Sequence, residues 1–401
     1  MIPEPLTYAN TRSKASWKPT PDQELLLRAC LLQADTAIDA WNSWKARVDI
    51  NALDPGSQRL LPLLHHNLRG HVRFEDIDGK LKGAYRETWY KNQLLFHRAA
   101  RLIERLHEAG IRTLVFKGPS LTVLYYGDLG LRPMNDFDLL VRKEDVVPAI
   151  ATLKLAGWVP VADICSHSVE FIIGMQNGLG FYNVETRAEL DLHWHAFFEC
   201  PREDFDRELW SRSKMVELRG IHTRALDTTD ELIYVCLHGS RKNQVPPIRW
   251  VADVYTILKT SASKIDWDRI ARVAVNERIV LPLKETLTYF QIFAPECVPA
   301  HFLRALQRKP AAMERIERWS GEIPASKMRK ILGLWFYVSR KERTSTIGGK
   351  LMGFFRYMQL RWKVNKLWKL PGAALRKIVK IRSQHRRRGL LRLPTASGSS
   401  Q

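Results

Sequence analysis

The feature that most constrains the fold is a block of short apolar runs, from Arg112 to Trp194, set between two long stretches with helical periodicity. Before the block, leucines and alanines recur at steps of three and four residues from Pro21 to about Glu108. From Arg202 onward the same periodicity returns. Apolar residues three or four apart predict amphipathic helices, whereas short β-branched runs bounded by glycine and proline predict strands. The pattern therefore indicates helices, then a small sheet, then helices.

Within this block we expect several strands and two helices. Residues Leu121–Tyr126 and Lys143–Ala156 are predicted to be helical, and Gly157 ends the second of them. The predicted strands are Arg112–Phe116, Phe137–Val141, Trp158–Val161, Val169–Met175, Gly178–Val184 and Arg187–Trp194. Such a block is too small for a doubly wound dinucleotide domain. The sequence also has neither G-x-G-x-x-G nor G-x-x-x-x-G-K-[ST].

The fold class that follows is α+β, with a small mixed sheet flanked by helical regions. We predict an N-terminal helical region over residues 1–108, an α/β core over 109–200 and a C-terminal helical region over 201–342. A basic amphipathic tail is predicted over residues 343–401, and its last residues are expected to be disordered.

The sharpest local motif is Asp136-Phe137-Asp138 at the start of a predicted strand. Residues i and i+2 of a strand point to the same face, so the two carboxylates would lie side by side. Two close carboxylates repel each other unless a cation lies between them. Oxygen ligands of this kind suit Mg²⁺ or Mn²⁺, which also bind phosphate oxygens. The motif alone is also common in solvated turns.

A third carboxylate, Asp191, lies in the middle of a predicted strand between two leucines. An acid among buried residues needs a partner. A metal ion shared with Asp136 and Asp138 would provide one. The alternative is a salt bridge from Asp191 to Arg132 or Lys117.

The order of these elements resembles the nucleotidyltransferase superfamily of the polymerase β type. The segment FKGPSLTVLYYGDLGLRPMNDFDLLVRKEDVVPAIATLKLAGW (residues 116–158) looks like an uncharacterised bacterial branch of it. The later ELDLHW (residues 189–194) resembles the strand that carries its third carboxylate. His238 and the segment Arg249–Asp253 (RWVAD) resemble the helices that follow in that branch.

The resemblance implies roles for individual residues. Asp136, Asp138 and Asp191 would bind metal and act in catalysis. Lys117, Gly118, Ser120 and Arg132 would bind the nucleotide, with Gly118 letting the backbone approach the triphosphate. The family usually has Gly-Gly or Gly-Ser in this turn, whereas here Pro119 follows Gly118, which removes one backbone donor.

Two histidines, His193 and His195, are spaced to share one strand face. A zinc site would need further ligands, for which His167 and Cys200 are the available residues. A packed or hydrogen-bonded pair of histidines is the simpler interpretation. For His238 and Asp253 we expect structural roles, although either residue is placed where it could close over the site.

The tail carries most of the net positive charge of the chain. From Thr344 to the end there are fourteen Lys or Arg and no Asp or Glu, against a net charge of +21. Aromatic residues alternate with these cations across residues 350–392. Such a segment can lie on an anionic membrane surface or hold a nucleic acid backbone. It can also form a helix that packs on the protein with its basic face in solvent.

The five cysteines are scattered and form no C-x-x-C pair, which is typical of free thiols in a reducing compartment. The N-terminus lacks the pattern of a signal peptide, and no apolar run is long enough to span a membrane. We therefore expect a cytoplasmic protein, with peripheral membrane association through the tail as an option.

These observations predict a metal-dependent nucleotidyltransferase that moves a nucleoside monophosphate from a nucleoside triphosphate to a hydroxyl acceptor, with Mg²⁺ or Mn²⁺ as cofactor. The sequence does not choose among protein, small-molecule and RNA acceptors. Two alternatives stay open. One is a glycosyltransferase that uses D-x-D to hold a metal and a sugar nucleotide. The other is a non-catalytic nucleotide sensor, or an adaptor that works through its tail.

Overall fold

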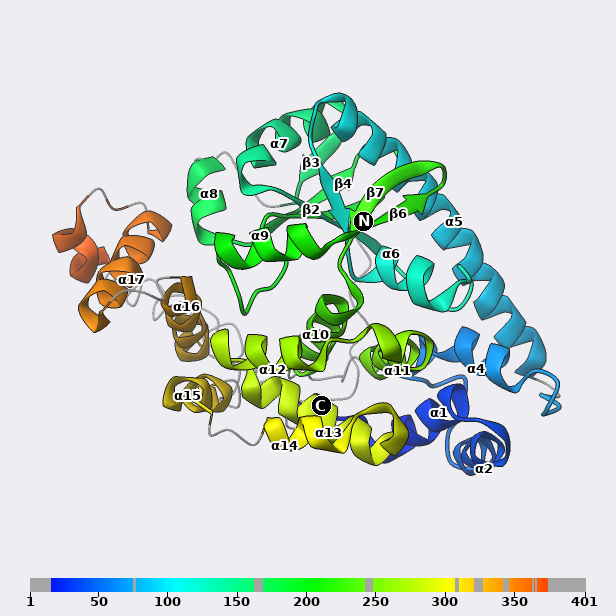
Figure 1. The fold of residues 1–401 in the computed structure, drawn as a ribbon. Helices are drawn as coiled ribbons and strands as arrows, with labels where there is room; N and C mark the ends of the chain where they lie inside the picture. Colours follow the sequence, from blue (N-terminus) through cyan, green and yellow to red (C-terminus); the bar gives the residue numbers. More distant parts are fainter. Residues whose placement is uncertain are drawn as a thin grey trace, which may run out of the picture. The chain divides into compact units, whose positions relative to one another are not determined.

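The computed structural model describes residues 16–74, 77–161, 169–241, 248–306, 310–320, 327–341, 346–362, 364 and 366–373. The chain divides into two compact units, residues 1–333 and 334–401. The first unit has a mixed sheet with helices on both faces (Figure 1), which confirms the predicted α+β class. No described helix is both long and apolar enough to cross a membrane.

Seven strands form the sheet in the order β3-β4-β5-β2-β1-β7-β6. The pairs β2–β5 and β1–β7 are parallel and the remaining pairs are antiparallel. The strands are β1 (Thr113–Val115), β2 (Asp136–Val141), β3 (Trp158–Pro160), β4 (Gly178–Asn183), β5 (Glu189–His193), β6 (Lys214–Leu218) and β7 (Ile221–Ala225).

The pairing of β2 with β5 fixes which side chains meet. In its register Asp138 lies beside Asp191, and Leu140 lies beside His193. Partners in a sheet share one face, and alternate residues of a strand point to opposite faces. The even-numbered residues of β2 and the odd-numbered residues of β5 therefore share one face. The residues between them, such as Leu139, are buried on the other face.

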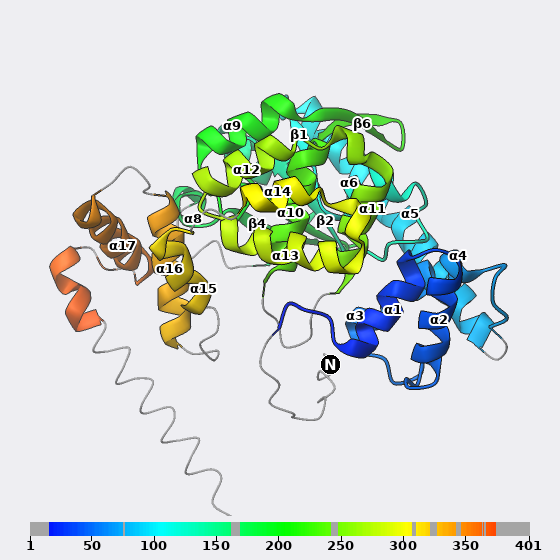
Figure 2. The ribbon, with the colours of Figure 1, turned by 60° about the horizontal axis from the view of Figure 1, so that its bottom comes forward.

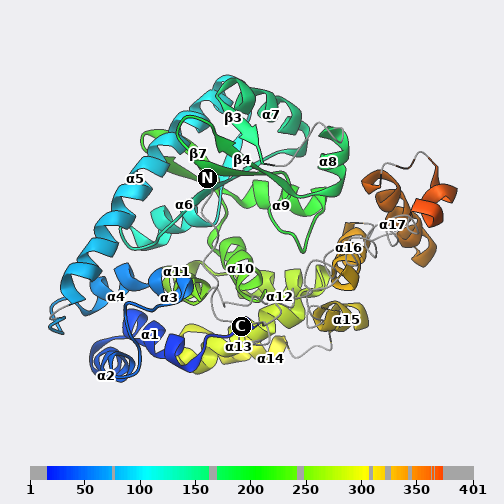
Figure 3. The same cartoon turned by 180° about the vertical axis from the view of Figure 1, so that it is seen from behind.

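Each face of the sheet has its own hydrophobic core. The face opposite Asp138 packs against α5, α7 and α8. The face that carries Asp138 belongs to a larger core with α9 to α14 and the N-terminal helices α1, α2 and α4. Figure 2 shows α10 to α14 gathered over the sheet, and Figure 3 shows α5 running from α4 up to the sheet. The site thus lies between the sheet and the helices of the larger core.

The helical bounds are as follows. The helices are α1 (Pro21–Leu31), α2 (Ala34–Lys45), α3 (Pro55–Gln58), α4 (Leu61–Leu68), α5 (Asp78–Glu108), α6 (Gly118–Leu121), α7 (Val146–Leu155), α8 (Val169–Met175), α9 (Glu203–Arg212), α10 (Thr228–Gly239), α11 (Arg249–Ser261), α12 (Trp267–Asn276), α13 (Val280–Phe293), α14 (Ala300–Ala305), α15 (Ala312–Ser320), α16 (Lys327–Lys341) and α17 (Ile347–Arg361). Short 3₁₀ turns cover Lys143–Asp145, Ala262–Lys264, Pro295–Cys297 and Leu367–Lys369, and a π-helical turn covers Thr122–Tyr126.

Two predictions of secondary structure were wrong. Val169–Met175 is helix α8 rather than a strand, because a short apolar run fits either element until its packing is known. The region after Arg202 is not all helical, since β6 and β7 form a hairpin. Its two turn residues, Arg219 and Gly220, have φ of 54° and 82°, as a tight two-residue hairpin turn requires. The sheet thus continues past residue 200, while the domain boundaries stay predictions.

Some predictions fall outside the described residues. They concern the first fifteen residues of the predicted N-terminal region, Cys165, His167, and the part of the predicted basic tail beyond Ala373. The four described cysteines are free thiols, and three of them are buried.

Candidate active site

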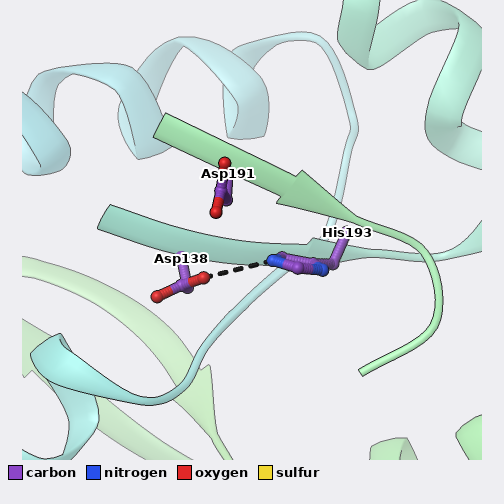
Figure 4. Close-up of side chains that lie close together, drawn as sticks. All are labelled: Asp138, Asp191 and His193. Atoms are coloured by element: carbon purple, nitrogen blue, oxygen red, sulfur yellow. Dashed lines mark hydrogen bonds and ion pairs between the residues drawn. The ribbon is translucent and has the colours of Figure 1, made fainter. Parts of the chain in front are cut away.

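Two of the predicted carboxylates, Asp138 and Asp191, meet on adjacent parallel strands (Figure 4). With His193, also on β5, they offer three ligand atoms that all lie within 4.8 Å of one another. Asp138 is only 2% exposed, and its Oδ1 lies 3.1 Å from Nε2 of His193. Nδ1 of His193 is buried and has no hydrogen-bond partner within the described parts of the chain. This set of donors fits a divalent cation.

Lys117 lies at the centre of this cluster. Its Nζ donates to Oδ1 of Asp138 and lies 3.5 Å from Nε2 of His193. Burial opposes ionisation of Asp138, but the ammonium group of Lys117 and the imidazole of His193 together hold the pKa of this carboxyl below its ordinary value. Asp138 is therefore charged at neutral pH, as a metal ligand must be.

The third predicted acid, Asp136, lies two residues before Asp138 on β2. It shares the face of Asp138, but it is exposed at the start of β2 and is not among the three clustered ligands. Partial desolvation by the surrounding protein and the neighbouring Asp138 carboxylate raise the pKa of Asp136. The structure thus brings together two of the three predicted acids and adds a histidine.

The turn from Lys117 to Ser120 is held by a residue far away in the sequence. Glu231, on α10, is fully buried and accepts the backbone N–H of Lys117 at 3.1 Å and the hydroxyl of Ser120 at 2.8 Å. Lys117 has φ of 59°, a conformation that costs free energy in a residue with a side chain. Glu231 therefore stabilises the backbone conformation from which the Lys117 side chain reaches Asp138.

Gly118 follows in this turn, and its lack of a side chain is needed for packing. A Cβ at this position would lie 2.6 Å from Sδ of Met134 and 3.1 Å from Nη1 of Arg132. Pro119 lies in the first turn of α6, where a missing N–H costs no intrahelical bond. The unusual Gly-Pro pair is thus compatible with the local helix.

Arg132 lies close to Gly118 and is held by Asp253 of α11. Its Nε and Nη2 donate to the two carboxylate oxygens at 2.7 and 2.9 Å, and both side chains are almost completely buried. The hydroxyl of Tyr126 donates to the same carboxylate at 2.9 Å. One nitrogen, Nη1, is buried without a partner in the described chain. Arg132 thus joins the loop before β2 to α11, beneath the turn at Gly118.

A cavity of about 340 Å³ opens beside Asp136 and Asp138. Burial and the nearby guanidinium of Arg132 lower the pKa of Arg249 to about 10. Burial and the cations of Arg241, Lys117 and Arg249 lower the pKa of His238 to about 3, which leaves it neutral. The lining cations are Arg59, Lys117, Arg132 and Arg249, and the lining acids are Asp136, Asp138, Glu189 and Asp253. Lys117 is paired with Asp138 and Arg132 with Asp253, so Arg59 and Arg249 are the described lining cations left to attract an anionic ligand such as a phosphate chain.

Three site residues were not predicted for these roles. His193 was expected to pair with His195, but His195 instead bonds Asp206 at 2.6 Å while His193 faces Asp138. The two-residue period of a strand could have placed His193 at the site, because His193 is two residues from Asp191 and therefore lies on the same face. Glu231 and Arg249 come from helices whose docking no local pattern reveals.

The buried carboxyl of Glu231 gives a test by pH. Burial, more than any other cause, raises its pKa from 4.5 to about 8. Between these values the folded chain keeps a proton that the unfolded chain has lost, so the free energy of unfolding falls as pH rises through this window. We expect urea unfolding, measured at several pH values between 4.5 and 8, to show a steeper fall in wild type than in Glu231→Gln, in which buried Asp230, with a pKa raised to about 7, still titrates. Parallel profiles would show that Glu231 is already ionised across the window.

Comparisons with known proteins give the family of the chain. Residues 56–295, more than half of the chain, match a family described as "Uncharacterised nucleotidyltransferase". The chain therefore belongs to this nucleotidyltransferase family. No protein of curated function matches it. The crystal structure of an antigenic nucleotidyltransferase-like protein from Paracoccidioides brasiliensis is similar over 53% of this chain and 92% of that chain, with 12% identity and a TM-score of 0.33.

Proposed function

We propose that this protein is a metal-dependent nucleotidyltransferase that transfers a nucleoside monophosphate from a nucleoside triphosphate to a hydroxyl group. The observation that carries the proposal is the convergence of Asp138, Asp191 and His193 beside a cleft lined by cations. Membership of the family favours this reaction over glycosyl transfer. A buried carboxylate beside a second carboxylate would also be a costly feature to keep in a purely structural protein.

Asp138, Asp191 and His193 would hold Mg²⁺ or Mn²⁺, and Asp136 is near enough in the fold to interact electrostatically with the two clustered acids. Their fit to a cation rests on the donor set itself, because two carboxylates and an imidazole nitrogen lie within 4.8 Å of one another. Both carboxylates also lie close enough to the ammonium group of Lys117 to raise its pKa. When bound, the ion would neutralise phosphate charge and lower the pKa of the attacking hydroxyl.

The other residues bind and position the substrate. Lys117 and Arg249 would neutralise phosphate oxygens, and Gly118 leaves room for the backbone to approach them. Ser120 and Arg132 keep the turn and the loop in place through Glu231 and Asp253. The hydroxyl oxygen forms a bond to the α-phosphorus as the bond to pyrophosphate breaks, and an acidic side chain of the site accepts the hydroxyl proton.

The test is transfer of label from α-³²P-labelled ATP, GTP, CTP and UTP with Mg²⁺ or Mn²⁺, with the protein itself and a cell extract as acceptors. We expect a labelled product that forms only when a divalent metal is present. Metal-dependent nucleotide binding without any labelled product would favour a nucleotide sensor. Absence of both would refute the proposal.

A second activity is suggested by α17 in the other unit of the chain. Ile347, Leu351 and Phe355 follow one another at four-residue steps and are 77%, 40% and 45% exposed. An exposed apolar stripe next to basic residues such as Arg356 is typical of helices that lie on anionic membranes. Through residues 350–392 the tail would then bind a membrane surface, with nucleic acid as the alternative partner.

For this tail we expect sedimentation of the full chain with vesicles that contain phosphatidylserine, and much less with vesicles of phosphatidylcholine alone. Replacing Leu351 and Phe355 by serine should release the protein, because the lost contact is apolar. Binding that survives these changes and is competed by an RNA oligonucleotide would instead identify nucleic acid as the partner.

A further inference from the structure

A second cavity, of about 660 Å³, adjoins the proposed active site. It lies between α5, the segment around α3 and α4, and the loop that leads into β2. Arg59, Met134 and Asn135 line both cavities, so the two spaces meet beside the residue that precedes Asp136. A ligand in the second cavity would therefore lie beside the first, and an arm of it that passed Asn135 would enter the space lined by Asp136 and Asp138.

The walls of this cavity are basic and polar. Lys80, Lys91 and Arg59 supply three cations, and Glu87 is the one acid among the lining residues of the described chain. Glu87 is itself paired with Lys91. Arg59 makes no ion pair within the described residues. These charges predict a ligand that carries a negative group.

The uncharged residues that line the second cavity narrow the chemistry of its ligand further. Gln58, Thr88, Asn92 and Asn135 supply hydrogen-bonding groups, which suits a ligand rich in hydroxyls. The side-chain oxygen of Asn92 is buried and has no partner in the described chain. No aromatic ring is among the described lining residues, so nucleobases would find no surface on which to stack. The volume is that of a small-molecule site.

We infer that this second cavity is the acceptor site, and that the acceptor is a small polyol that carries a phosphate group, such as a sugar phosphate. The inference rests on the proposed transfer reaction and names its second substrate. The phosphate would lie near Arg59 and Lys91, since the ammonium group of Lys80 is held by Ile50 O and Asn51 Oδ1. A free hydroxyl would reach past Asn135 toward Asp136. There its oxygen would bond to the α-phosphorus while pyrophosphate leaves, and its proton would pass to a carboxylate of the site.

Gly83 allows a clean test. It lines the second cavity from α5, and a Cβ at this position would meet no atom within 4 Å. Gly83→Phe should fill the cavity without disturbing the fold, since it removes a glycine from the interior of a helix. Gly79→Phe is the matched control, because Gly79 lies one turn earlier on α5, is equally free of neighbours and does not line the cavity. A second pair is Lys91→Gln with Lys82→Gln as its control.

Binding would be measured by calorimetry on the full chain, with ribose 5-phosphate, glucose 1-phosphate and glycerol 3-phosphate as probes and ribose, glucose and glycerol as their uncharged counterparts. We expect at least one phosphorylated probe to bind, its counterpart to bind far more weakly, and Gly83→Phe and Lys91→Gln to weaken binding by about tenfold or more. Gly79→Phe and Lys82→Gln should bind as wild type does, and Gly83→Phe should still bind nucleotide.

Several results would overturn the inference. They are binding of none of the phosphorylated probes, equal binding by Gly83→Phe, or an RNA oligonucleotide that binds in their place and is lost in Gly83→Phe. Failure of the proposed reaction is recognised separately. A polyol phosphate that binds in the cavity, with no label passed from any of the four nucleotides to it, to the protein or to the extract, would refute the transfer and leave only the binding site standing. Label transferred to an acceptor other than a polyol phosphate would support the transfer reaction and refute the assignment of this cavity as the acceptor site.

Discussion

Replacing Asp138 with asparagine is expected to lower the rate of nucleotidyl transfer by about a thousandfold or more, which corresponds to roughly 4 kcal/mol of lost transition-state stabilisation. Asparagine has nearly the same shape, so the packing of this buried side chain is kept. What is lost is the charge, which would hold the metal and already attracts Lys117 and His193. Asp191→Asn should have a similar effect, because its carboxylate belongs to the same cluster.

The rate would be measured as label transferred from α-³²P-labelled nucleotide at saturating metal. Glu217→Gln is a suitable control, since it neutralises an exposed carboxylate on β6 of the same sheet. Circular dichroism should show the same fold in all variants. A rate for Asp138→Asn within a few fold of wild type would mean that this cluster is not the catalytic centre.

A variant of Asp136 distinguishes the metal ligands predicted from the sequence from those that the structure clusters. The sequence predicts that Asp136, Asp138 and Asp191 all bind metal, whereas the structure clusters Asp138 and Asp191 with His193 and leaves Asp136 exposed at the edge. If the clustered set holds the metal, Asp136→Asn should reduce the rate less than Asp138→Asn does, and should raise the metal concentration needed for half of the maximal rate only slightly. Equal losses in the two variants would favour the arrangement predicted from the sequence.

The acids were predictable because their signals are local. A D-x-D motif before an apolar strand and an acid between two leucines both follow from the two-residue period of a strand. The same period places His193 on the face of Asp191, but the sequence does not say which strand lies beside β5. Only the parallel pairing with β2 brings that face onto Asp138.

The support of the site was not predictable, because it is not local. Glu231 and Asp253 reach the turn and the loop over more than a hundred residues of sequence. On α10 Glu231 is surrounded by buried residues, and no sequence rule distinguishes a buried acid with a function from one at a helix surface. The β6–β7 hairpin is a different case, since its alternating residues and its Arg-Gly turn were a readable signal.

Loss of the Asp253 carboxylate is expected to destabilise the protein by about 3–5 kcal/mol, because the guanidinium of Arg132 would be left buried without its partner. Urea unfolding of Asp253→Leu should show this as a lower midpoint at an unchanged slope. Transfer should also slow, because Arg132 lies beneath Gly118 at the mouth of the cleft. Asp268→Leu, which changes an exposed acid on α12, should leave both quantities almost unchanged.

The double variant Arg132→Met/Asp253→Leu separates structure from substrate binding. Replacing both partners of a buried ion pair by apolar residues of similar size is often nearly neutral for stability. We therefore expect the double variant to regain most of the stability that Asp253→Leu loses, while transfer stays slow if Arg132 also attracts phosphate. Recovery of both would make Arg132 purely structural. Recovery of neither would mean that the bond from the hydroxyl of Tyr126 to Asp253 is itself needed for stability.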